Sequence, residues 1–152
     1  MSFRIKGLPA EPFRDLFALS DAELKARNVV RRVAAHPAPC RVSLTDAAHG
    51  QEILLVNYTH HAVDNPYHAH YAIWVRAGEA TYDAVDQVPE QLRRRVLAVR
   101  TWDAQDMMVG HEVVDGRALE GAIGRLFAEP RASYMHAHFA GPGCYAARIE
   151  RA

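Results

Sequence analysis

The chain contains very little lysine and cysteine and no long hydrophobic run. Lys6 and Lys25 are its only lysines, so arginine supplies nearly all of the eighteen basic side chains. These balance eighteen acidic ones, and the formal net charge at pH 7 is zero. A neutral chain gives no global electrostatic reason to expect a nucleic acid or an anionic membrane as a partner, and we predict neither.

Two cysteines, Cys40 and Cys144, are too few for a disulfide framework. The longest aliphatic run, residues 53–56, is far shorter than the ~20 residues of a membrane span, and the N-terminal residues lack the apolar segment of a signal peptide. With 152 residues the chain has the size of one domain. We therefore predict a single domain over residues 1–152, located in the cytoplasm, with reduced thiols.

Several common catalytic motifs are also missing. The sequence has no Gly-x-Ser-x-Gly elbow, no Walker loop and no glycine fingerprint for dinucleotides. The segment 111–115, HEVVD, ends in aspartate where a zinc-protease motif needs a second histidine. The usual hydrolase and nucleotide-enzyme templates therefore receive no support.

The pattern of apolar residues predicts an α+β fold. Helices are expected at 11–19, at 20–27 with a Ser20–Glu23 capping box, at 88–95 and, as the strongest, at 117–130. Expected strands are 3–8, 29–35, 41–45 and 52–61 as a hairpin, 68–76, 96–103, 106–115, and two more around residues 140–143. Because strands and helices do not alternate regularly, we predict a mainly antiparallel β-sheet packed against one long and two short helices.

Two His-x-His strands are the most unusual feature. Alternation along the strand places Met135 and Ala137 on the core face and turns His136 and His138 to the opposite face. Segment 68–76 repeats the arrangement, and the predicted metal ligands for a divalent transition metal are His136, His138, His68 and His70. His60, His61, His111 or Cys144 could complete the shell. The alternative is that these are polar outer-face residues bonded to water or to neighbours.

Cys144 follows Gly143 at a predicted tight turn, across a hairpin from His136 and His138. A nearby histidine or positive charge would make this thiol nucleophilic, and the alternative is a small buried side chain. The same alternatives hold for Cys40. Three arginines lie inside predicted strands: Arg76, Arg100 and Arg148. We expect each of them either to bind an anionic ligand, to pair with a carboxylate or to face solvent. Residues 93–95, three arginines in a row, are expected to be a solvated helix end.

Several motifs occur in an order that resembles a bacterial family, domain of unknown function 1203. They are PCRVSL (residues 39–44), LLVNY, NPY, AIWVR, SYMHAHFA and the C-terminal GCYAARIERA. The resemblance implies no established activity, substrate or cofactor. The positions that match its motifs are Cys40, Arg41, His136, Cys144 and Arg148. Some relatives carry cysteine at the positions of Ser43 and Ala147, so a cysteine-rich metal site would be incomplete in this chain.

Together these features favour a small domain that binds a small molecule or a metal ion. The predicted ligand-binding residues are Cys40, Arg41, Arg100, Cys144 and Arg148, on a sheet face shared with the four histidines named as metal ligands. One alternative is a small enzyme that uses Cys144 or a histidine as nucleophile or general base. Another is a structural or regulatory homodimer without a site.

Overall fold

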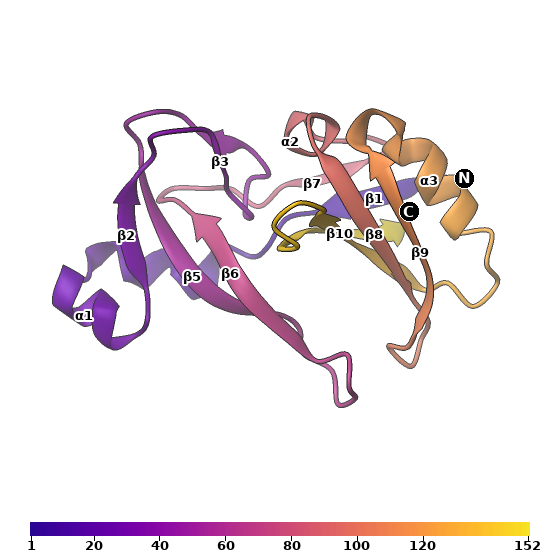
Figure 1. Cartoon of the computed structure of the whole chain (residues 1–152), viewed down its shortest axis with the longest axis horizontal. Coiled ribbons are helices and arrows are strands. Elements are labelled where there is room, and N and C mark those ends of the chain that lie inside the picture. The colour runs from indigo at the N-terminus through magenta and orange to yellow at the C-terminus, as the bar shows by residue number, and fades with distance from the viewer.

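The computed structural model describes residues 1–152. Its strands pair antiparallel, as predicted, but they form three sheets instead of one (Figure 1). The largest sheet has six strands in the order β7-β1-β11-β10-β8-β9. Its strands are β1 (Phe3–Lys6), β7 (Asp83–Val85), β8 (Val96–Trp102), β9 (Met108–Asp115), β10 (Tyr134–Phe139) and β11 (Tyr145–Arg151). Every pairing in this sheet is antiparallel, and the first and last strands of the chain lie side by side.

A second sheet of three strands lies beside the first (Figure 1). It consists of β2 (Val30–Val33), β5 (Glu52–His61) and β6 (Ala69–Val75), with β5 in the middle. A short pair, β3 (Ala38–Pro39) and β4 (Asp46–Ala47), completes the strands. The turn between β10 and β11 projects from the first sheet towards the second (Figure 1).

The helices are all short. They are the 3-10 helices η1 (Glu11–Ala18) and η2 (Gly116–Ala118), and the α-helices α1 (Asp21–Ala26), α2 (Glu90–Arg93) and α3 (Leu119–Leu126). One long and two short helices are therefore not confirmed. The expected long helix is shorter because residues 116–118 form a 3-10 turn capped by the Asp115 side chain, and the chain leaves α3 at Phe127. No helix has the length and apolar composition needed to cross a membrane.

The predicted capping box at the start of α1 is confirmed. The Ser20 hydroxyl accepts a hydrogen bond from the Glu23 backbone N–H at 3.2 Å, and the Glu23 carboxylate accepts one from the Ser20 N–H at 2.7 Å. The helix stops before Asn28, which adopts the left-handed conformation (φ 57°). Local sequence thus specifies both ends of this helix.

The two faces of the six-stranded sheet have different coverings. One face packs against α3 in the main core, through Met135, Ala137 and Ile149 from the sheet and Leu119 and Ile123 from the helix. The opposite face carries His136 and His138, as strand alternation predicted. These histidines are nevertheless buried, because the second sheet covers this face.

The predicted hairpin of 41–45 with 52–61 is wrong. Residues 41–44 form a turn between β3 and β4, and β5 pairs with β2 and β6 instead. Leu44 in this turn has a φ of 50°, a conformation that apolar residues seldom adopt in a strand. The turn is held in place by side chains from distant segments, which local patterning does not reveal.

Candidate functional site

Two β-bulges bring histidines from both sheets together. In β5 the register with β6 shifts between Thr59 and His61, so that the consecutive residues His60 and His61 both contact the six-stranded sheet. In β10 the register with β11 shifts between Ala137 and His138. A bulge re-aims side chains that regular alternation would send to opposite faces.

The result is a cluster of four imidazoles between the sheets. Ring centroids of His136 lie 5.1 Å from His61, 6.3 Å from His60 and 6.4 Å from His138, and those of His60 and His138 are 5.4 Å apart. The Tyr145 ring stacks on His60 at 5.0 Å. The cluster borders a space of about 170 Å³, the histidine cavity, lined by His60, His61, Pro66, Tyr67, His68, Ala69, Arg100, Trp102, His136 and His138.

The predicted four-histidine metal set is only partly brought together. His68 lines the histidine cavity but its Nδ1 lies 3.1 Å from the Val63 carbonyl oxygen, and His70 is exposed and does not line it. The partners of His136 and His138 are His60 and His61 instead. No group of three or more histidine, cysteine, aspartate or glutamate side chains is arranged to hold a metal ion.

Burial keeps the central histidines neutral. It lowers the pKa of His136 to about 2 and that of His138 to about 3, and the charges of His61 and Arg100, respectively, act in the same direction. The pKa of His60 falls to about 4, mainly through burial and next through His61. Neutral imidazoles present a lone pair on one ring nitrogen, so the cluster offers acceptors as well as donors.

A second site surrounds Arg41, which is only 1% exposed. Its Nε donates to the Tyr145 carbonyl oxygen at 2.7 Å and its Nη1 donates to the Pro39 carbonyl oxygen. Its Nη2 lies 3.0 Å from the Cys144 sulfur. No carboxylate forms an ion pair with Arg41. Burial lowers the pKa of this guanidinium, while the neighbouring thiols of Cys144 and Cys40 oppose the shift.

The Arg41–Cys144 pair borders a larger space of about 530 Å³ between the two sheets, which we call the thiol cavity. Its lining is Pro37, Pro39, Arg41, Leu55, Tyr71, Ala72, Trp74, Arg95, Val96, Phe139, Gly141, Pro142 and Cys144. Both Arg41 and Arg95 stack on the Phe139 ring, with guanidinium carbons 4.8 and 5.2 Å from its centroid. The cavity is therefore mainly apolar and aromatic, with two cations and one thiol.

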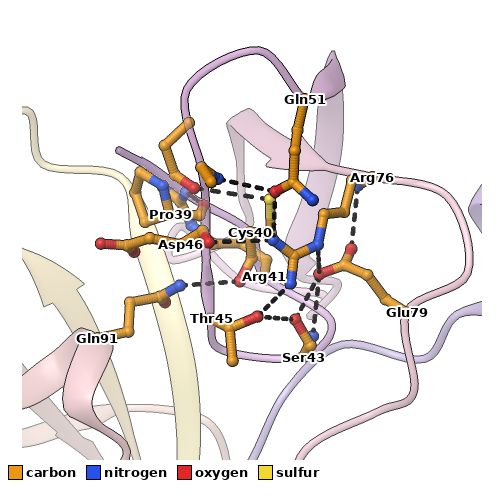
Figure 2. A network of polar contacts seen from close by, with 12 residues as sticks. Pro39, Cys40, Arg41, Ser43, Thr45, Asp46, Gln51, Arg76, Glu79 and Gln91 are labelled. Atoms are coloured by element: carbon orange, nitrogen blue, oxygen red, sulfur yellow. Dashed lines mark hydrogen bonds and ion pairs between the residues drawn. The ribbon is translucent and has the colours of Figure 1, made fainter. Parts of the chain in front are cut away.

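A polar network holds the turn that carries Arg41 (Figure 2). Arg76 donates to the Asp46 carbonyl oxygen at 3.0 Å and to the Thr45 hydroxyl, and Glu79 accepts from the Ser43 hydroxyl at 2.6 Å. Gln91 donates to the Cys40 carbonyl oxygen at 3.1 Å. Arg76, one of the arginines predicted to bind an anion, pair or face solvent, is thus a structural partner of this turn.

The turn also needs Gly7. A Cβ atom at this position would lie 2.0 Å from the Val42 carbonyl oxygen, well inside any permitted contact. The Leu8 N–H donates to the Arg41 carbonyl oxygen at 2.8 Å in the same region. The close passage of residues 7 and 8 therefore fixes the backbone from which Arg41 reaches Cys144.

Cys40 and Cys144 have different surroundings. Both are free thiols, but Cys40 is fully buried, donates to the Ala38 carbonyl oxygen at 3.6 Å and lines neither cavity. Burial, followed by the charge of Glu79, raises the pKa of Cys40 to about 12. Of the two thiols, Cys144 is the one that borders a cavity.

The expected convergence of Cys144 with His136 and His138 is wrong. Because His138 pairs with Tyr145 across the bulge, the Tyr145 ring faces the histidines, and Cys144 belongs to the main core and borders the thiol cavity. The thiol and the imidazoles therefore lie at two separate cavities. The hairpin register decides this, and the sequence does not specify a one-residue bulge.

Two predicted ligand-binding residues, Arg100 and Arg148, do not line the thiol cavity. Arg100 lines the histidine cavity rather than the thiol cavity. Arg148 lines neither; its Nε lies 2.6 Å from Glu150, and its guanidinium carbon lies 3.9 Å from the Tyr134 ring centroid.

Sequence reasoning missed Arg95. This residue was expected at a solvated helix end, yet it lines the thiol cavity and pairs with Asp46 at 2.9 Å. The one local signal of this placement is its position directly before β8, because a residue at the start of an interior strand lies close to the sheet. His60 and His61 were named only as additional ligands, although their two adjacent rings form half of the cluster.

Comparison with known proteins gives a family and no further relative. No curated protein and no solved structure matches the chain. The model of the family described as "Protein of unknown function (DUF1203)" matches residues 37–151. This range includes both segments that meet at Arg41 and Cys144, the PCR turn and the C-terminal GCY. The chain therefore belongs to the DUF1203 family of proteins of unknown function.

Proposed function

We propose that the protein binds a small organic anion in the thiol cavity. The observation that carries this proposal is the buried guanidinium of Arg41, which has two carbonyl oxygens and a thiol as partners but no carboxylate. A buried cation without an anionic partner is unfavourable, and an anion that enters the cavity would compensate its charge. Arg95 adds a second cation, partly balanced by Asp46.

The rest of the lining suits an apolar or aromatic body. Trp74, Tyr71 and Phe139 provide flat surfaces, and Pro37, Pro39 and Pro142 provide rigid apolar ones. A space of about 530 Å³ is within the range of small-molecule sites, which are mostly apolar with a few placed polar groups. The proposed ligand therefore has an aromatic or aliphatic body and one anionic group directed at the two arginines.

A covalent role for Cys144 is a second candidate function, favoured by the contact of its sulfur with Arg41. A neighbouring positive charge stabilises a thiolate, which is the nucleophilic form of cysteine. The activating group would be an arginine and not a histidine, because the imidazoles belong to the other cavity. The thiolate would add to an activated carbon–carbon double bond of the bound anion, so that the C–S bond forms, the π bond breaks and the proton lost by the thiol is returned to the neighbouring carbon.

An aromatic sulfonate, 1-anilinonaphthalene-8-sulfonate, tests the binding proposal by fluorescence titration. We expect saturable binding by the native protein and at least about tenfold weaker binding by Arg95→Gln. Arg94→Gln is the matched control, since Arg94 is the exposed neighbour in the sequence and does not line the cavity. Ala72→Phe, which fills the cavity, should also abolish binding. Equal affinities of the Arg95 and Arg94 variants would contradict the proposal.

Alkylation by iodoacetamide tests the covalent role. In a Cys40→Ala background only Cys144 can react, and we expect its modification, followed by mass spectrometry, to slow when the sulfonate occupies the cavity. Arg41→Met should slow it at least about tenfold, because the thiolate loses its counter-charge. A Cys144 that stays unmodified in the native protein would exclude the nucleophile and leave the binding proposal intact.

A further inference from the structure

The histidine cavity concentrates polar atoms that have no partner. Seven buried side-chain nitrogen or oxygen atoms of the chain lack a hydrogen bond, and four of them belong to residues that line this cavity. They are His60 Nδ1, His136 Nδ1, His138 Nε2 and Trp102 Nε1. His136 and His138 are 2% and 1% exposed. Buried polar groups are normally satisfied, so this concentration indicates a polar occupant.

The tautomer of His138 defines what the occupant must supply. Its Nδ1 lies 3.1 Å from the Gly143 carbonyl oxygen, which can only accept, so Nδ1 carries the proton. In the neutral ring the unpartnered Nε2 is then an acceptor, and it requires a hydrogen-bond donor from the ligand. Trp102 Nε1, which can only donate, requires an acceptor.

Arg100 determines the charge of the occupant. It is the one arginine among the lining residues, and no carboxylate lines the cavity or forms an ion pair with it. Backbone register places it directly opposite His136 on the neighbouring strand, so both side chains are on the same face. A guanidinium that lines the cavity without a carboxylate partner favours an anion.

We propose that the histidine cavity binds a small oxyanion that also carries an O–H group, with Arg100 as its counter-charge. The anionic oxygen accepts from Arg100 and from the Trp102 indole, and the O–H donates to His138 Nε2. Hydrogen phosphate and small hydroxycarboxylates share this chemistry. A space of about 170 Å³ holds several waters, each taking about 30 Å³, and thus admits ligands of that size. The site is distinct from the thiol cavity and does not depend on it.

Matched pairs of anions test this proposal by isothermal titration calorimetry at neutral pH. Inorganic phosphate keeps at least one proton there and is compared with sulfate, which has none; glycolate, which has a hydroxyl, is compared with acetate. We expect one O–H-bearing anion to bind at least about tenfold more tightly than its partner, which also identifies the source class. No binding of any of the four, or equal affinities within both pairs, would overturn the proposal, as would tight binding of zinc in place of the anions.

Variants locate the binding within the cavity. Arg100→Gln should weaken it at least about tenfold, and Arg125→Gln, which removes an exposed arginine of α3, should leave it unchanged. His60→Gln is the second variant, since His60 is only half-buried and its loss need not unfold the protein. Unaltered affinity of Arg100→Gln would contradict the assignment, and a change in His60→Gln would place the bound anion among the imidazoles. Circular dichroism and the urea unfolding midpoint of each variant serve as the control for an intact fold.

Discussion

The Nη2 atom of Arg41 lies 3.0 Å from the sulfur of Cys144, 103 residues further along the chain. The contact joins the PCR turn to the β10–β11 turn, and Cys144 is the only hydrogen-bond partner of that nitrogen. Arg41 is buried, so removal of this partner leaves a charged N–H without an acceptor.

The stability of a Cys144 variant should therefore depend on whether the new side chain can accept a hydrogen bond from Arg41. Cys144→Ala is expected to lower the free energy of unfolding by about 1–3 kcal/mol, because a buried donor loses its partner. Cys144→Ser restores an acceptor and should recover part of that loss. Urea denaturation measures the free energy of unfolding of both variants. A serine variant no more stable than the alanine variant would show that the contact contributes nothing to stability.

The buried histidines predict a loss of stability in mild acid. His136 and His138 have pKa values of about 2 and about 3 in the folded protein, lowered first by burial and then by His61 and Arg100, with Arg148 also acting on His136. The ordinary pKa of histidine is 6.5, so below that pH the unfolded chain binds protons that the folded protein does not. Stability should be fully present above pH 6.5 and fall as the pH decreases towards the folded values.

The expected slope is up to about 1.4 kcal/mol per pH unit for each of the two groups. Urea midpoints compared between neutral pH and about pH 5 measure it before most carboxylates titrate. Replacement of His138 by Asn should reduce the slope, whereas replacement of the exposed His111 should not. A midpoint that stays constant over this range would mean that these imidazoles are not neutral when buried.

A partly buried hydrogen-bond chain predicts a third effect. Tyr134 donates to Asp106 Oδ1 at 2.6 Å, and its hydroxyl oxygen lies 2.8 Å from His61 Nε2. Tyr134→Phe leaves two polar atoms without this partner and should cost about 1–3 kcal/mol of stability. The control is Tyr71→Phe, because Tyr71 is 51% exposed and forms no hydrogen bond through its hydroxyl. Thermal or urea unfolding measures the stability of both variants. Equal stabilities would show that the hydrogen bonds of Tyr134 do not stabilise the protein.

Two glycines should respond in opposite directions to alanine. At Gly7 the new Cβ would meet the Val42 carbonyl oxygen, so Gly7→Ala must displace the PCR turn and destabilise the protein by about 1–3 kcal/mol or more. At Gly124, inside α3, the Cβ meets nothing within 4 Å, and Gly124→Ala should stabilise by up to about 1 kcal/mol. The urea unfolding midpoint of each variant is compared with that of the native protein. A Gly7 variant as stable as the native protein would show that the turn can move freely.

Regular local patterns in the sequence correctly predict part of this architecture. The Ser20–Glu23 box predicts α1, and the alternation of residues 134–139 correctly separates Met135 and Ala137 from His136 and His138. Such features depend on neighbours in the sequence, so they can be recognised without a structure. The family resemblance likewise identified Arg41 and Cys144 as positions of interest, although not as partners.

The sites themselves depend on features that have no local pattern. A bulge at His60 turns two consecutive histidines to the same neighbouring sheet, and a second bulge separates Cys144 from His138. The turn at 41–44 resembles a strand in composition and is held by Arg76 and Glu79 from another segment. Burial by a second sheet is also a tertiary effect, and it converts an outward-facing histidine strand into a buried cluster.

Tyr145 contacts both Arg41 and the histidine cluster, although it lines neither cavity. Its carbonyl oxygen binds Arg41 Nε at 2.7 Å, while its ring stacks on His60 and meets His136 edge-on at 5.2 Å. The carbonyl that holds Arg41 therefore belongs to the same residue whose ring packs among the imidazoles. A single tyrosine thus fixes how the guanidinium and the imidazoles are placed relative to each other.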